Sequence, residues 1–65
     1  MLNTYKLYES AAGEWGSIQI VAAHSEEEAR EIVTWDCHAE TERCEKIEGL
    51  FYDGEPKVLA YYDSR

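Results

Sequence analysis

Apolar and polar residues alternate over the first part of the chain. The alternation runs from Leu2 to Glu9 and again from Ser17 to Ala23, and a period of two residues is typical of a half-buried strand. The intervening segment, 11–16, contains two glycines, which favour a turn. In the first strand, Tyr5 and Leu7 share one face, and Leu2, Thr4, Lys6 and Tyr8 share the other. The pattern predicts an N-terminal β-hairpin.

A helix-start signal follows directly. Ser25 precedes three glutamates; its hydroxyl can accept a hydrogen bond from a free amide of the first turn, and Glu28 can reach back to the Ser25 amide. Carboxylates also stabilise the positive end of the helix dipole. We expect the helix to end between Trp35 and Glu40. Residues at helical spacing are predicted to face the sheet, namely Ala29, Ile32, Val33 and Cys37.

Two further strands are predicted after the helix. A polar connection at 39–42 precedes the first, Cys44–Tyr52, whose apolar parity changes near Gly49 and so indicates a bulge or bend. Asp53-Gly54 is a strong turn signal, so Val58–Tyr62 is expected to return as the second arm of a hairpin. Its two faces carry Val58, Ala60 and Tyr62 on one side, and Leu59 and Tyr61 on the other.

These elements predict a single domain, residues 1–65, of the α+β class. Its order is ββαββ, with a four-stranded, mainly antiparallel sheet and one helix packed on one face. The first and last strands are bulky on both faces, so we expect both to lie centrally. The face opposite the helix then receives several of the five tyrosines. These either roof a small core or form the centre of a dimer or partner contact.

Charge adds most to this picture. The chain has 14 acidic and 6 basic residues and a net charge of −8. Such a surface repels nucleic acid and membranes and attracts basic surfaces. The acids between Glu26 and Glu48 are either a solvated face or a carboxylate array that resembles the phosphates of DNA. The predicted partner-binding residues are Glu27, Glu31, Trp35, Asp36, Glu40, Glu42, Glu45 and Glu48.

Other chemistry is less favoured by the residues. A 65-residue chain leaves little room for an enclosed active site, and no catalytic residues or cofactor are expected. Cys37, His38 and Cys44 offer ligands that zinc prefers, but their spacing lacks a Cys-x-x-Cys pair, so no metal is expected. The N-terminus has no signal-peptide pattern and no apolar run long enough to span a membrane. We therefore predict a cytoplasmic protein with reduced cysteines.

Two segments carry a resemblance to a known family. Val21–Ala29, a strand that leads into a capped helix, and Ile47–Pro56 resemble small accessory proteins of phages and conjugative plasmids of the DpnD/PcfM type. The resemblance covers about half of the chain and implies no catalytic residues. In size and acidity the chain is also similar to anti-CRISPR proteins, which bind host nucleases and block their DNA sites.

The sequence thus predicts a small acidic protein-binding module. We expect an inhibitor that presents carboxylates to a basic, nucleic-acid-handling protein such as a nuclease, as a DNA mimic does, without binding nucleic acid or membrane itself. One alternative is a homodimeric structural module that pairs through the tyrosine face or an edge strand. A second is a small zinc-binding protein that uses Cys37, His38 and Cys44.

Overall fold

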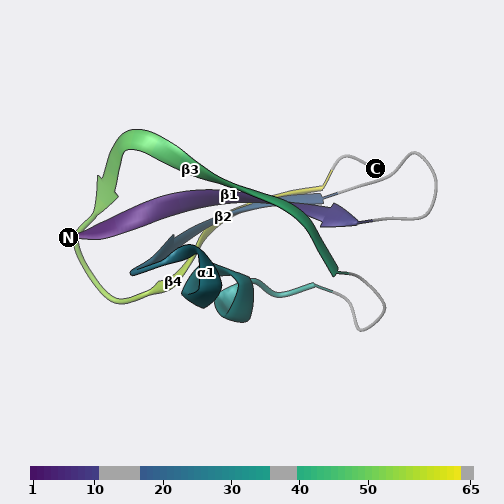
Figure 1. Cartoon of the computed structure of the whole chain (residues 1–65), viewed down its shortest axis with the longest axis horizontal. Helices are drawn as coiled ribbons and strands as arrows, with labels where there is room; N and C mark the ends of the chain where they lie inside the picture. Colours follow the sequence, from purple (N-terminus) through teal and green to yellow (C-terminus); the bar gives the residue numbers. More distant parts are fainter. Residues whose placement is uncertain (11–16, 36–39, 64–65) are drawn as a thin grey trace.

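The computed structural model describes residues 1–10, 17–35 and 40–63 (Figure 1). It contains strands β1 (Leu2–Ser10), β2 (Ser17–Ala23), β3 (Glu40–Tyr52) and β4 (Lys57–Asp63), with helix α1 (Glu26–Ile32) between β2 and β3. The strands form one sheet in the order β3-β1-β2-β4, and each neighbouring pair is antiparallel. The predicted α+β class and ββαββ order are confirmed. The glycine-containing turn predicted at 11–16 lies outside the described residues.

The strand order differs from the prediction in one respect. β1 is central as expected, but β4 is an edge strand, and β3 lies at the opposite edge. The predicted hairpin of the last two strands is therefore wrong; segment 53–56 instead passes the end of the sheet where β1 begins (Figure 1). Tyr61 and Tyr62 are 55% and 63% exposed, and tyrosine tolerates water through its hydroxyl. Large side chains on both faces of β4 therefore did not indicate a central position in the sheet.

Helix α1 covers one face of the sheet because β2 and β3 run in the same direction. β1 lies between these two strands, so the chain must cross over the sheet to connect them, and α1 forms part of this crossover. The core lies between α1 and the face of the sheet that α1 covers. There, Tyr5, Leu7, Val21 and Ala23 of the sheet pack with Ala29 of the helix. Leu7 and Val21 are fully buried, and each stabilises the fold by about 1.5–3 kcal/mol.

We call the opposite side of the sheet the open face. Cross-strand pairing places Lys6 opposite Ile20 and Tyr8 opposite Ile18, which in turn lies opposite Tyr62. Tyr5 is in the core, so the open face holds fewer tyrosines than the sequence indicated. Val58 also packs against the core, because a register shift between Ile20 and Val21 leaves Leu59 without a partner. The prediction that Val58, Ala60 and Tyr62 share a face is therefore wrong.

The helix is shorter than predicted. It ends at Ile32, and its C-cap Val33 is already extended, with φ −56° and ψ 140°. The following residue, Thr34, is held by Gln19 of β2: the Gln19 Nε2 donates to the Thr34 carbonyl over 2.7 Å, and the Gln19 Oε1 accepts from the Thr34 amide over 3.2 Å. This side chain thus bonds the Thr34 backbone as a neighbouring strand would. Cys37, predicted to lie on the helix, is outside the described residues.

Strand β3 begins earlier than predicted, at Glu40 and not at Cys44, and it bends where expected. The pairing with β1 shifts register between Asn3 and Tyr5, and Gly49 within this irregularity has φ 78°. A positive φ favours glycine because it has no Cβ. The Thr4 hydroxyl stabilises the bulge, because it donates a hydrogen bond to the Leu50 carbonyl over 2.9 Å. The bulge predicted near Gly49 is confirmed.

Candidate functional site

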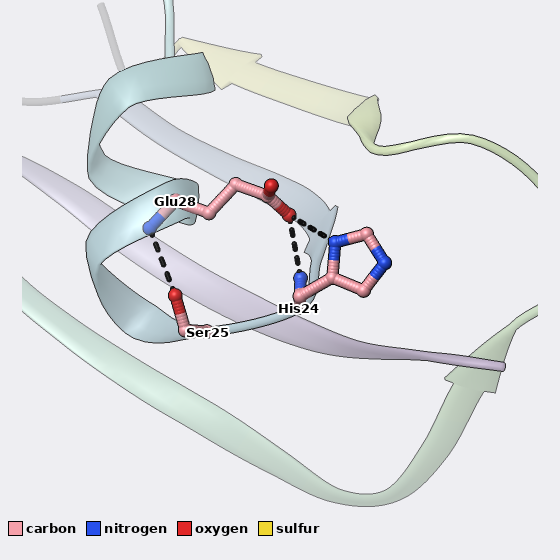
Figure 2. Close-up of polar contacts among 3 residues, drawn as sticks. All are labelled: His24, Ser25 and Glu28. Atoms are coloured by element: carbon pink, nitrogen blue, oxygen red, sulfur yellow. Dashed lines mark hydrogen bonds and ion pairs between the residues drawn. The ribbon is translucent and has the colours of Figure 1, made fainter.

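The N-terminus of α1 is organised by three neighbouring residues (Figure 2). The Ser25 Oγ accepts from the Glu28 amide over 3.2 Å, which confirms Ser25 as the N-cap. The Glu28 carboxylate accepts from the His24 amide over 2.7 Å and lies 2.8 Å from the His24 Nδ1. The return bond therefore goes to His24 and not to Ser25 as predicted. The hydrogen bond from the His24 amide is the main cause of a lowered pKa of Glu28.

A group of carboxylates lies beside this cap. Glu27, Glu28 and Glu31 of α1 and Glu55 of the β3–β4 connection line one open depression of about 760 Å³, together with Ser25, Ile32 and Pro56. We call these four glutamates the carboxylate flank. The flank combines residues far apart in sequence, because the connection 53–56 crosses the end of the sheet on its way to β4. Among the described residues that line the depression, none is basic.

Glu26, the one acid of the helix outside the carboxylate flank, forms an ion pair with a basic residue. The Glu26 Oε2 lies 3.3 Å from the Arg30 Nε, one turn further along the helix. Glu27 and Glu31, also one turn apart, are both exposed and carry the same charge. Such a like-charged pair costs about 0.2–0.5 kcal/mol. The helix therefore retains two carboxylates at a small energetic cost without neutralising them.

The acids of β3 form a separate group. The Glu45 Oε1 accepts from the Tyr8 hydroxyl over 2.9 Å, and its Oε2 lies 3.8 Å from the Arg43 Nε. Glu42 lines a smaller depression with Tyr8 and Arg43, and Glu40 and Glu48 are exposed. The predicted array is thus divided. Glu27 and Glu31 belong to the carboxylate flank, whereas Glu42 and Glu45 lie on the edge strand β3 beside Tyr8 and Arg43.

Trp35, predicted as an anchor for a partner, packs against the core. Its side chain is half-buried beside the core cluster, and its Nε1 donates to the Thr41 hydroxyl over 2.8 Å. The indole therefore connects the segment after α1 to the start of β3. Asp36 lies outside the described residues.

A second hollow lies on the open face, and sequence reasoning did not find it. This groove of about 300 Å³ is lined by Lys6, Ile18, Ile20, Ala60, Tyr61 and Tyr62. Three basic residues of the described part of the chain stand over tyrosine rings: Lys6 and Arg43 over Tyr8, and Lys57 over Tyr52. The Tyr8 and Tyr52 side chains are the main causes of raised pKa values of Arg43 and Lys57. In the sequence, the spacing of two residues between Lys6 and Tyr8 already indicated that these side chains share one face of β1.

The structure describes only one of the two cysteines, so it tests the zinc alternative only in part. Cys44 is a half-buried free thiol, and burial is the main cause of its raised pKa, followed by the charge of Glu26. Among residues 1–10, 17–35 and 40–63, no group of three or more His, Cys, Asp or Glu side chains is placed to hold a metal ion. Cys37 and His38 lie outside these ranges, so the zinc hypothesis stays a prediction.

The remaining findings concern membranes and known proteins. In the part of the chain that the structure describes, no helix is long and apolar enough to cross a membrane. Comparison with protein-family models, with curated protein sequences and with solved structures found no match. The resemblance to phage and plasmid accessory proteins therefore stays a prediction.

Proposed function

We propose that this protein works by binding another protein, and that the carboxylate flank faces a basic surface that handles nucleic acid, such as the DNA groove of a nuclease. The observation that carries the proposal is the gathering of Glu27, Glu28, Glu31 and Glu55 around one depression without a basic lining residue. A basic groove that accepts these carboxylates would release its own counterions, as it does when it binds phosphates. The protein would then compete with nucleic acid for that groove.

Binding is a better match than catalysis for these carboxylates. A carboxylic acid that donates a proton near neutral pH needs a raised pKa. The pKa of Glu28 is lowered by its bonds to His24, and Glu27, Glu31 and Glu55 are exposed to water. Exposed carboxylates gathered in this way suit the long-range attraction of a basic partner.

The proposal is tested by capture of partners from the native host with paired charge-reversal variants. Glu27→Lys/Glu31→Lys reverses two of the four charges of the flank, and Glu40→Lys/Glu48→Lys makes the same change of net charge on the exposed acids of β3. We expect the flank variant to lose the partner that the wild-type protein captures, and the β3 variant to keep it. Equal loss with both variants, or retention by the flank variant, would contradict a role for the flank.

The captured partner then allows a kinetic test. Electrostatic attraction acts mainly on the association rate, and the screening length falls to about 8 Å at physiological ionic strength. We expect a rise from low to physiological salt to slow association and to change dissociation little, as measured by surface plasmon resonance. A salt effect confined to dissociation would argue against steering by the flank.

A further inference from the structure

The outer edge of β4 is the less protected edge of the sheet. The β3 edge carries several charged side chains and the bulge at Gly49, which are features that prevent a further strand from pairing. In β4, Lys57 is followed by five uncharged residues, Val58–Tyr62. Within the described sheet, β4 has β2 as its one neighbour. The backbone on the outer side of β4 can thus pair with another strand.

The groove on the open face lies directly behind this edge. Ala60 lies opposite Ile20, and Tyr62 lies opposite Ile18, and these four residues line the groove. Ala60 is exposed and has the smallest side chain among the lining residues, so space remains above it. The Tyr62 side chain, in contrast, is 63% exposed. The edge therefore offers a small residue and a projecting aromatic ring two positions apart on one face.

Symmetry and the bulge of β4 restrict how two copies of this strand can pair. In an antiparallel pair related by a twofold axis, one residue lies opposite itself. The bulge turns Val58 to the core, whereas Ala60 and Tyr62 face the open side. A pair centred on Ala60 would put Val58 opposite Tyr62, on different faces, and a pair centred on Tyr62 would run past the end of β4 at Asp63. A pair centred on Tyr61 stays within the regular part of the strand.

We propose that this protein forms a twofold homodimer in which the two β4 strands pair antiparallel around Tyr61. The two sheets then form one continuous sheet through backbone hydrogen bonds. In this register, Tyr62 of each copy lies opposite Ala60 of the other, with Cβ atoms about 4.5–5.5 Å apart. The Tyr62 ring passes over Ala60 and covers Ile20 on the next strand. The twofold axis forms this contact twice.

The size of the contact indicates a weak dimer. Tyr61 and Tyr62 are 55% and 63% exposed, and a fully buried aromatic side chain covers about 150–250 Å². The four tyrosines of the dimer therefore bury no more than roughly 600 Å², whereas a stable interface buries about 1,200–2,000 Å². We expect a dissociation constant between about 10 µM and 1 mM.

Charge gives this dimer a distinctive dependence on salt. Each copy has a net charge of −8, so the two copies repel each other over a distance, and salt screens this repulsion. The contact itself is uncharged, and antiparallel pairing places the two Glu55 residues, which precede β4, at opposite ends of the joined strands. Salt should therefore strengthen the dimer, whereas it weakens a complex that the carboxylate flank forms with a basic partner.

The first test is analytical ultracentrifugation of the full-length protein from about 10 µM to 1 mM, at low and physiological salt. Tyr62→Lys removes the ring from the contact. Phe51→Lys is the matched control, because it makes the same change of charge at an aromatic residue of β3 that is 52% exposed. We expect Tyr62→Lys to weaken dimerisation by at least about tenfold and Phe51→Lys to leave it unchanged. Circular dichroism checks that both variants are folded.

The second test reads the register by NMR. In a sample that mixes isotope-labelled and unlabelled chains, we expect intermolecular NOEs between the Ala60 methyl group of one copy and the Tyr62 ring of the other. A dimer without these NOEs would overturn the proposed register.

Three other outcomes would overturn the proposal. The first is a monomer at all concentrations, which would leave the β4 edge to a different partner. The second is an equal loss of the dimer in Phe51→Lys and Tyr62→Lys, and the third is a dimer that salt weakens. The flank variant Glu27→Lys/Glu31→Lys should dimerise at least as strongly as the wild-type protein, because the flank and the groove share no lining residue. Failure of the dimer is thus distinguishable from failure of the proposed function.

Discussion

The hydrogen bonds between Gln19 and Thr34 lead to a sharp prediction about stability. Gln19 is fully buried on β2, and its side-chain amide makes three hydrogen bonds to Thr34: from its Nε2 to the carbonyl over 2.7 Å, and from the Thr34 amide and hydroxyl to its Oε1 over 3.2 and 3.3 Å. Gln19→Leu keeps a side chain of similar size and removes all three. We predict that this variant is destabilised and that the segment after α1 loosens.

The magnitude follows from the exposure of the two partners. Each hydrogen bond contributes a net of about 0.5–1.5 kcal/mol. Thr34 is exposed, so water can replace part of what its amide and carbonyl lose, and leucine adds favourable apolar burial. We therefore expect a loss of about 2 kcal/mol, near the middle of the range for a polar group left unsatisfied. A chain of this length has a total stability of only roughly 3–10 kcal/mol.

The assay is urea unfolding followed by far-UV circular dichroism, combined with hydrogen exchange at the Thr34 amide. Thr34→Ala is the matched control, because it removes one of the three hydrogen bonds and should cost less than about 1 kcal/mol. In Gln19→Leu we expect a lower urea midpoint and faster exchange at Thr34. An unchanged midpoint with Thr34 still protected would refute the view that Gln19 holds this segment.

Three further predictions concern the core, the bulge and the helix cap. Ala29→Leu should overpack the space between α1 and the sheet, where Ala29 is fully buried, and lower stability by about 1–3 kcal/mol; Ala60→Leu on the exposed edge should change the urea midpoint little. Gly49→Ala should cost about 1 kcal/mol by backbone strain alone, since φ is 78° and space for a Cβ is open; Gly49→Asn should lose less by the same measurement, because asparagine tolerates positive φ better. The pKa of Glu28 is lowered from its ordinary value of 4.5, so the ionised carboxylate contributes its full stabilisation above pH 4.5 and loses it as the pH falls through the folded-state pKa. Glu28→Gln should therefore lose less stability in acid than the wild-type protein, measured as urea midpoints at neutral and acidic pH.

The candidate site was only partly predictable from the sequence. The negative charge of α1 was visible as a run of glutamates, and the pairing of Glu26 with Arg30 follows from helical spacing. Glu55 joins Glu27 and Glu31 only because the β3–β4 connection crosses the end of the sheet. Similarly, Glu45 looked like a member of the acidic array, but its strand places it beside Tyr8 and Arg43. Spacing along one helix can be read locally, whereas neighbours on different elements depend on topology.

The sequence by itself determined that the chain forms four strands and a helix in the order ββαββ, that Ser25 caps the helix, and that β3 bends at Gly49. These features depend on residues within a few positions of one another, because alternation, capping and positive φ are properties of the local backbone. Only the tertiary structure decided where α1 ends, since Gln19 of β2 captures Thr34. It also decided that β4 lies at an edge and that β3 and β4 do not pair. Strand partners are set by the burial and crossover geometry of the whole sheet, which no local pattern contains.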